Sequence, residues 1–226
     1  WADQPHIISI SPYVRERLSG IATGVIHDID NPISESFFHI ERKERKGVIF
    51  SAAVISQRKN TLNLIKAFKI LLDEGHDAEL RLAGTVVEQP YGELVKDYIS
   101  QMGLGKKVAM LGQINAGQIH EELSIASIFA LVSLEEGSPM GIEEAMAARV
   151  PVVTSNRCGM PYMVRHGESG YLVNPLDVPD IARRLKNILE DNEMLDSMGR
   201  RAHAIALDRF HPSVVAKRTK EVYYKV

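Results

Sequence analysis

The sequence predicts an α/β fold, a Rossmann-like doubly wound parallel sheet with helices on both faces. From residue 47 onward, short apolar runs alternate with amphipathic segments of about 10–15 residues, as in βα units. The apolar runs are rich in Val, Ile and Leu without polar alternation, which is typical of strands buried on both faces. Capping residues and glycines separate the segments at the expected helix ends. A ligand is expected at the carboxyl ends of the strands of such a sheet.

The first 46 residues have a different pattern. Apolar residues 6–10 and 25–27 predict two short strands. Between them, Ser11 followed by proline predicts the start of a helix that ends near Gly20, because serine is a good N-cap and proline suits the first turn. Residues 33–46 end in six consecutive charged residues and predict a solvated linker.

From residue 47 the apolar runs predict strands at residues 48–55, 78–83, 108–111, 128–132, 151–154 and 171–173. Asn60, Asn115 and Asp177 are candidate N-caps of helices. Helical spacing predicts helices at residues 60–74, 92–102, 116–124, 140–148, 177–190, 193–207 and 212–224. The last of these has an apolar face that we expect to be partly bare, formed by Val214, Val215, Val222 and Tyr223.

Composition excludes several classes of protein. The net charge of −2 over 226 residues gives no global basic field, so no nucleic-acid partner is expected. The single cysteine, Cys158, excludes an internal disulfide and fits a reducing, cytoplasmic compartment. No apolar run approaches the roughly 18 residues of a membrane span. The chain begins at Trp1 rather than Met, which suggests a fragment of a longer protein.

The central stretch of the chain is Leu134–Ala147, between the apolar runs 128–132 and 151–154. Ser138 is the candidate N-cap of its helix, and Pro139 suits the first helical turn. The first turn of a helix has free N–H groups and a partial positive charge, which together favour binding of a phosphate.

Two carboxylates, Glu136 and Glu144, bracket this turn eight positions apart. An ionised carboxylate accepts several hydrogen bonds and can hold a hydroxyl-rich ligand. Their neighbours Glu135 and Glu143 are expected to be solvated. Two glutamates at this spacing are common by chance, and a helix with a charged surface would have the same pattern.

The sequence Glu136-Gly-Ser-Pro, then Glu144-Ala-Met-Ala and Pro-Val-Val, resembles the E-x7-E motif of retaining nucleotide-sugar glycosyltransferases with the GT-B architecture, most closely family 4. The resemblance covers nearly the whole chain and is strongest over residues 132–177. It implies that Glu136 contacts the transferred sugar and that Glu144 holds the ribose hydroxyls. It also implies that the helix start binds the donor diphosphate, through Gly137, Ser138, Pro139, Met140 and Gly141.

The resemblance implies two further groups of donor-binding residues. Lys59 matches a family lysine that neutralises the diphosphate of the donor. The family's arginine in the same loop falls at Ala53, so that charge is missing, and we expect Arg58 to point elsewhere. The base would be bordered by residues at a strand end, namely Gly112, Gln113 and Ile114. Cys158 and Tyr162 stand where the family often has Gly and Glu.

The implied organisation is the C-terminal half of a GT-B enzyme. Residues 1–46 would be the tail of the N-terminal domain with the crossover linker, residues 47–208 the donor-binding domain, and residues 209–226 a helix that packs toward the missing N-terminal domain. The implied activity is transfer of a hexose from a nucleoside-diphosphate sugar to a hydroxyl acceptor, a saccharide or lipid-linked glycan, with retention. The fragment would be inactive alone, because the acceptor site belongs to the absent half.

No metal or cofactor is expected, since the sequence has neither a zinc HExxH motif nor a P-loop. The parent enzyme is expected in the cytoplasm, with a peripheral position on the inner face of the membrane as a further option. Two alternatives remain open. One is a non-catalytic nucleotide-sugar-binding module, suggested by Ala53 and Tyr162. The other is a different GT-B enzyme such as a nucleotide-sugar 2-epimerase, which needs a second set of acid–base residues.

Overall fold

The computed structural model describes residues 2–224, so residue 1 and residues 225–226, which belong to the expected first and last segments, lie outside the described part. A six-stranded sheet with the order β5-β4-β3-β6-β7-β8 forms its centre, and every neighbouring pair is parallel. The strand order reverses between β3 and β6, which is the switch point where ligands bind in such sheets. The strands are β3 (Val48–Ala52), β4 (Glu79–Ala83), β5 (Val108–Gly112), β6 (Ile128–Leu131), β7 (Val152–Ser155) and β8 (Gly170–Val173).

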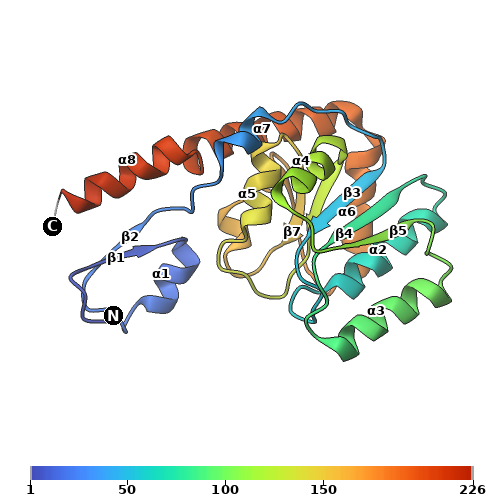
Figure 1. Cartoon of the computed structure of the whole chain (residues 1–226), viewed down its shortest axis with the longest axis horizontal. Coiled ribbons are helices and arrows are strands. Elements are labelled where there is room, and N and C mark those ends of the chain that lie inside the picture. The colour runs from blue at the N-terminus through green and yellow to red at the C-terminus, as the bar shows by residue number, and fades with distance from the viewer. Residues whose placement is uncertain (1, 225–226) are drawn as a thin grey trace.

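Helices cover both faces of this sheet, as Figure 1 shows. They are α2 (Thr61–Asp73), α3 (Gln89–Gln101), α4 (Ala116–Ile125), α5 (Met140–Ala147), α6 (Val178–Glu190) and α7 (Asn192–Arg209). Helices α2, α3 and α6 share one apolar core with the sheet, α4 and α5 share the other, and α7 contributes to both. Strand β3 has Ile49 in the first core and Phe50 in the second, both fully buried. The predicted doubly wound α/β fold is therefore confirmed.

Two of the predicted element ends differ from the observed ones by three residues. Strand β3 ends at Ala52 rather than at residue 55, and the chain beyond forms a turn. Helix α3 begins at Gln89 rather than residue 92, because Pro90 is tolerated in a first helical turn. Asn60 precedes α2 as predicted, but it does not cap the helix with its side chain. Its amide instead donates to two buried carbonyls, those of Val132 at 3.0 Å and Pro175 at 2.7 Å.

The expectation of a solvated linker over residues 33–46 is wrong for its first half. A 3₁₀ turn, η1 (Glu35–His39), places Phe37 and Phe38 in the second core. Within the charged run, the guanidinium of Arg42 donates to the carbonyls of Leu123 and Ala126 at the end of α4. Helix ends leave carbonyls without partners, so this arginine acts as a distant cap. The run of charged residues after the aromatic pair indicated a solvated segment, although Phe37 and Phe38 themselves are buried.

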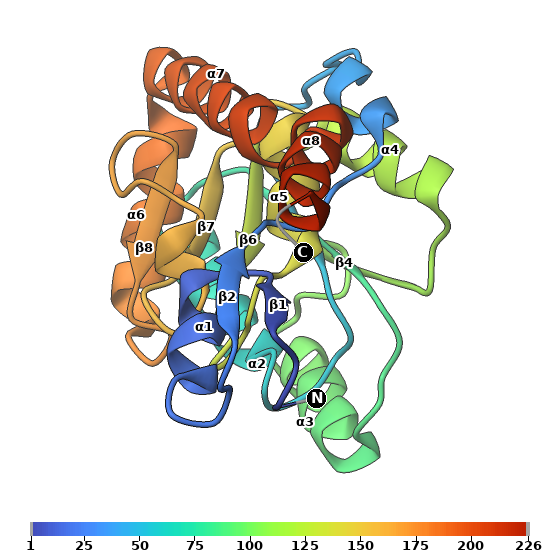
Figure 2. The same ribbon diagram turned by 90° about the vertical axis from the view of Figure 1, so that its left-hand side faces the viewer.

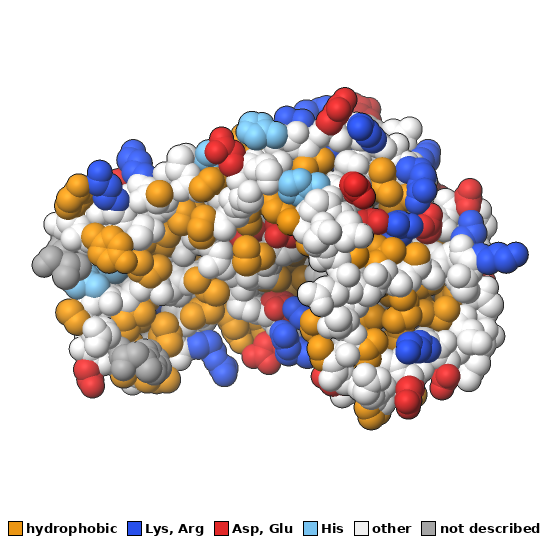
Figure 3. Space-filling model, viewed as in Figure 1, with side chains coloured by type: hydrophobic (Ala, Val, Ile, Leu, Met, Phe, Trp, Pro, Cys, Tyr) orange, Lys and Arg blue, Asp and Glu red, His pale blue; other side chains and the backbone are white. Residues whose placement is uncertain are grey.

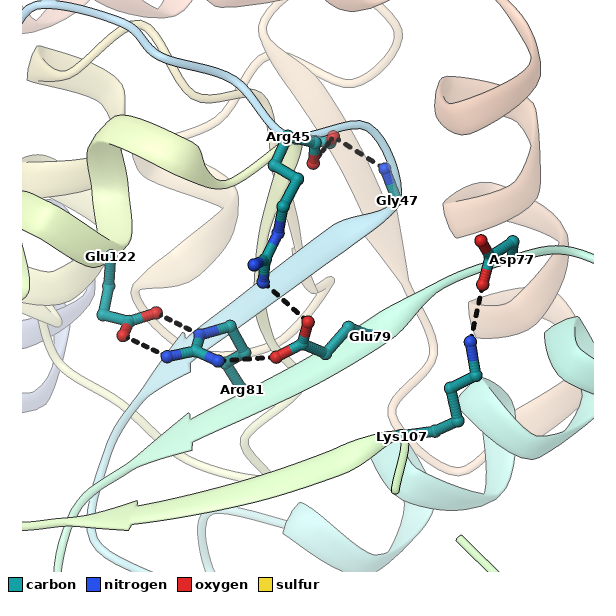
Figure 4. A network of polar contacts seen from close by, with 8 residues as sticks. Arg45, Gly47, Asp77, Glu79, Arg81, Lys107 and Glu122 are labelled. Carbon is teal, nitrogen blue, oxygen red and sulfur yellow. Dashed lines mark hydrogen bonds and ion pairs between the residues drawn. The ribbon is translucent and has the colours of Figure 1, made fainter. Parts of the chain in front are cut away.

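A network of charges fixes the rest of this segment to the sheet (Figure 4). Arg81 of β4 donates two hydrogen bonds to Glu122 of α4, at 2.5 and 2.6 Å, and another to Glu79. Arg45 reaches the same Glu79 at 2.6 Å. The hydrogen bonds with Glu122 raise the pKa of Arg81, so its guanidinium stays charged. The linker is therefore held in one position on the sheet.

A small first lobe lies beside the main sheet, at the left of Figure 1. It consists of β1 (His6–Ser9), α1 (Pro12–Leu18) and β2 (Val25–Asp28), with the two strands parallel. Helix α8 (Pro212–Tyr223) extends along it in both Figures 1 and 2. Ile29, Val215 and Val222 form a separate apolar cluster there. The predicted helix at residues 12–20 and its Ser11 cap are confirmed, since the Ser11 hydroxyl accepts from Val14 N–H.

The apolar face of α8 is partly covered. Val215 and Val222 are buried against the segment after β2, whereas the Tyr223 side chain is 71% exposed. Figure 3 shows hydrophobic side chains gathered at this end of the molecule. The face is therefore partly bare, as predicted, and Tyr223 is its exposed part.

Candidate functional site

A hollow of about 240 Å³ opens at the carboxyl ends of the strands, beside the switch point between β3 and β6. Four residues predicted to bind a ligand line it, namely Gln113, Ile114, Gly141 and Glu144. The rest of its wall is small and apolar, formed by the ends of β3 and β4 with Ala52, Ala53, Val54, Ala83 and Gly84, and by Ile119 of α4. The remaining predicted residues lie in the adjacent β3–α2 and β6–α5 loops and at the end of β5.

Glu144 lies on α5 in the wall of this hollow. Burial raises the pKa of its carboxyl group from 4.5 to about 7, because the surroundings disfavour the charged form. Perturbed carboxyl groups in a hollow are typical of functional sites, since they hold a proton near neutral pH. This side chain can accept hydrogen bonds from a ligand when ionised and donate one when protonated.

Glu136 is held by two cations from the loop after β3. Its Oε1 atom accepts a hydrogen bond from the ammonium of Lys59 and lies 3.3 Å from Nη1 of Arg58. The carboxylate side chain is only 10% exposed. The sequence therefore correctly singled out Glu136 and Lys59 as residues of one region, and the structure brings them into direct contact.

The expectation that Arg58 points elsewhere is wrong. The backbone N–H of Leu134 donates to the Arg58 carbonyl at 2.8 Å, which joins the β3–α2 loop to the β6–α5 loop. The Arg58 guanidinium in turn donates to the Glu135 carbonyl at 2.8 Å. Only the register between these two loops brings Arg58 to Glu136, and no local pattern in the sequence encodes that register.

The predicted N-cap of α5 is also wrong. Pro139 occupies the N-cap position, and no side chain caps this helix. The hydroxyl of Ser138 instead donates to Oε1 of Glu143 at 2.8 Å. Among residues 2–224, the amides of Met140 and Gly141 have no hydrogen-bond acceptor. The tip of α5 is thus free to bind an anion through these two N–H groups.

Glu143 is fully buried, contrary to the expectation of a solvated residue. Burial raises the pKa of its carboxyl group to about 8, although the Ser138 hydrogen bond lowers it in part. Its second oxygen has no hydrogen-bond partner among the described residues. Glu143 could not be recognised from the sequence, because a pair of adjacent glutamates usually indicates an exposed face, whereas the side of α5 on which Glu143 lies is covered.

Two hydrogen bonds fix the turn between Glu136 and Gly137. Gly159 N–H donates to the Glu136 carbonyl at 2.8 Å, and Ser11 of the first lobe donates through its hydroxyl to the Gly137 carbonyl at 2.9 Å. A Cβ atom at position 159 would lie 1.7 Å from the oxygen of Gly137, so only glycine allows this approach. The position of the turn therefore depends on both the loop after β7 and the first lobe.

Three further positions singled out from the sequence lie around this region. Gly112 ends β5 with a φ of +66°, which glycine adopts readily, and so directs the chain toward Gln113 at the hollow. Tyr162 donates through its hydroxyl to Glu16 of α1 at 2.9 Å. Cys158 lies near the Leu134 carbonyl, 3.9 Å from the thiol sulfur. The tyrosine is thus turned toward the first lobe.

Among residues 2–224, no group of three or more His, Cys, Asp or Glu side chains could hold a metal ion. Over the same range no helix combines the length and apolar character needed to cross a membrane.

The parallel sheet with its switch point, the hollow and the uncapped tip of α5 define a Rossmann-like ligand-binding domain. The family described as "Glycosyl transferases group 1" matches residues 32–204. The chain therefore belongs to the group 1 glycosyltransferases.

Curated relatives are also glycosyltransferases for the most part. The N-acetyl-alpha-D-glucosaminyl L-malate synthase of Bacillus anthracis is 25% identical over 81% of this chain and 46% of its own length. An exopolysaccharide phosphotransferase of Streptomyces coelicolor is 30% identical over 92% of this chain but only 22% of its own length. A D-inositol 3-phosphate glycosyltransferase of Streptomyces scabiei is 29% identical over 71% of this chain and 37% of its own length. The chain thus spans less than half of each relative.

Solved structures show the same fold. HepE of Anabaena in complex with UDP-glucose superposes with a TM-score of 0.85 at 22% identity, over 98% of this chain and 64% of that one. A mutant of TarM from S. aureus, in complex with Fondaparinux, alpha-GlcNAc-glycerol and UDP, gives a TM-score of 0.85 at 15% identity, over 97% and 44%. These likenesses support the Rossmann-like C-terminal domain of a GT-B architecture.

Proposed function

We propose that this chain is the donor-binding half of a retaining, family 4-like hexosyltransferase, which moves a hexose from a nucleoside-diphosphate sugar to a hydroxyl acceptor. One observation carries the proposal. The free tip of α5, Glu144 in the wall of the hollow and the Glu136–Lys59 pair all lie at the carboxyl edge of one parallel sheet. An anion, a polyol and a departing phosphate each find a suitable group there.

Each part of the donor has a proposed partner. The diphosphate binds at the tip of α5, over residues 137–141, with the ammonium of Lys59 nearby. Glu144 accepts hydrogen bonds from the ribose hydroxyls, and the base lies along Gln113 and Ile114 in the apolar part of the hollow, next to Gly112. Glu136 contacts the transferred sugar. These contacts position the donor and stabilise the negative charge that develops on the leaving diphosphate.

The reaction class accounts for the charge arrangement. A leaving nucleoside diphosphate gains negative charge in the transition state, so cations and helix N–H groups placed at its oxygens lower the barrier. Two structural neighbours were solved in complexes that contain UDP or UDP-glucose, which supports a nucleoside diphosphate as the leaving group here. We propose no metal and no cofactor for this step, and we place it in the cytoplasm.

The acceptor belongs to the part of the enzyme beyond this chain. The relatives named above act, by their names, on malate and on inositol phosphate, so family membership does not select an acceptor. We propose a saccharide or lipid-linked glycan hydroxyl, and we expect no transfer by this chain alone. A non-catalytic sugar-nucleotide-binding module is the second candidate, favoured by the apolar Ala53 in the hollow.

Calorimetric titration of the 226-residue chain with UDP, GDP and ADP tests the donor site. We expect one of the three to bind, and Glu144→Ala to abolish that binding. Glu121→Ala is the matched control, because Glu121 is an exposed glutamate on α4 outside the hollow. Absence of binding by all three diphosphates, or unchanged affinity in Glu144→Ala, would refute the assignment. If the binding results support the assignment, donor hydrolysis or transfer by the full-length parent would exclude a non-catalytic module.

A further inference from the structure

We propose that Arg58 is a diphosphate-binding residue of this protein, which supplies the second positive charge that the sequence lacks at Ala53. The inference rests on the proposed function, since it concerns the phosphates of the same donor. It assigns the charge to the far end of the β3–α2 loop rather than to the end of β3.

The first step is the position of Arg58. Its carbonyl accepts from Leu134 N–H, and its guanidinium donates to the carbonyl of Glu135 and lies 3.3 Å from the Glu136 carboxylate. The backbone of Arg58 is thereby joined to the loop that leads directly into α5. The free amides of Met140 and Gly141 follow only a few residues further along the chain.

The second step is the sum of charges. Lys59 and Glu136 form a close ion pair, which by itself is neutral. Arg58 adds one positive charge to this pair, so the three residues together carry +1. Without Arg58 the region would offer an arriving diphosphate a neutral ion pair, and the attraction for its phosphates would come from the tip of α5 alone.

The third step is mobility. The Lys59 side chain is 14% exposed, whereas that of Arg58 is 50% exposed. If the Lys59 ammonium left Glu136 for a phosphate, the Glu136 carboxylate, which is only 10% exposed, would lose its closest partner. Leaving a buried charge unpaired costs free energy. Arg58 can turn from Glu136 to a phosphate, because Lys59 continues to balance the negative charge of the carboxylate. Its guanidinium also suits a phosphate, because two N–H groups can bind two oxygens at once.

The fourth step is the environment of Ala53. This residue lines the apolar hollow together with Ala52, Val54 and Ala83, and no cation lies on that wall. A positive charge for the diphosphate must therefore come from another segment. Of the cations that contact Glu136, Arg58 is the one with an exposed side chain.

The test compares nucleoside diphosphates with their nucleosides on the 226-residue chain. Calorimetry on the wild type should show that one of UDP, GDP and ADP binds more tightly than its own nucleoside. Arg58→Ala should weaken diphosphate affinity at least about tenfold, the scale of a hydrogen bond to a charged group. The affinity for the nucleoside should stay unchanged, and Arg58→Lys should recover part of the loss. Arg183→Ala, an exposed arginine of α6 with its own ion pair, is the matched control.

Each outcome decides between the two proposals. If the wild type binds no diphosphate, the proposed function fails first. If the wild type prefers the diphosphate but Arg58→Ala binds it equally well, the function stands and Arg58 has no role in it. An equal loss of nucleoside and diphosphate affinity would show a structural role and also overturn the inference. Arg58→Gln, a milder change, replaces the alanine variant if far-ultraviolet circular dichroism shows that variant to be unfolded. The dependence of diphosphate affinity on salt concentration should be weaker in Arg58→Ala and in Arg58→Gln than in the wild type, because both variants lack the positive charge.

Discussion

Replacing Glu143 by glutamine should make the stability of this protein much less sensitive to rising pH. The carboxyl group is fully buried, one oxygen accepts from Ser138, and the other has no partner among the described residues. Asp30 raises the pKa further, and Arg209 lowers it. The ordinary pKa of 4.5 therefore becomes about 8 in the folded protein.

The sign and size of the effect follow from this difference. Between pH 4.5 and 8 the unfolded chain loses the proton that the folded protein keeps, so the free energy of unfolding falls as pH rises. One pKa unit corresponds to about 1.4 kcal/mol, and the full difference gives at most about 5 kcal/mol. Above pH 8 both states are ionised and the loss is complete. Glutamine is neutral at every pH and keeps an oxygen for Ser138.

Urea denaturation of the wild type and of Glu143→Gln at several pH values from 5 to 9 measures this difference. Glu144 and all other groups titrate in both proteins, so the difference between the two curves isolates Glu143. We expect the variant to gain stability relative to the wild type as pH rises, and Glu121→Gln to follow the wild type throughout. Parallel curves for Glu143→Gln and the wild type would refute the argument.

Three further predictions concern the site and its support. Affinity for the bound diphosphate should fall about tenfold from pH 8 to 6, because Glu144, with its pKa raised to about 7 by burial, loses the charge that accepts ribose hydroxyls; calorimetry on Glu144→Gln should give a shallower profile, and an equal slope in both proteins would assign the effect to another group. Gly159→Ala should weaken the same binding and lower stability by a few kcal/mol, since its Cβ would lie 1.7 Å from the Gly137 oxygen; wild-type affinity in that variant would show that the turn can move freely. Arg42→Ala should cost about 1–3 kcal/mol in urea denaturation, because the carbonyls of Leu123 and Ala126 lose their donor; a loss no larger than that of the exposed control Lys43→Ala would contradict the assigned role.

Much of the fold could be predicted because its determinants are local. Apolar runs of strand length and capping residues are read within a few positions, and Asn115 and Asp177 cap their helices as predicted. Asn60 has the right residue type for a cap, but its amide satisfies two buried carbonyls instead. The position of those carbonyls depends on how the chain packs around them, and nothing in the sequence near Asn60 indicates this.

Only some residues of the candidate site could be predicted from the sequence. Glu136, Lys59 and Glu144 could be found because they match the residues of the family that the sequence resembles. Arg58 could not, because its direction depends on the register between two loops far apart in the sequence. Glu143 could not either, because the burial of one side of α5 depends on how the helix packs.

The attachments of the first lobe have a mechanical consequence. Asp30, just after β2, is bonded to Arg209 at the end of α7, while Ser11 donates to the Gly137 carbonyl and Glu16 accepts from Tyr162. Rotation of the lobe about the Asp30–Arg209 pair would therefore strain both of the other hydrogen bonds. The position of the lobe and that of the turn at Gly137 are thus coupled.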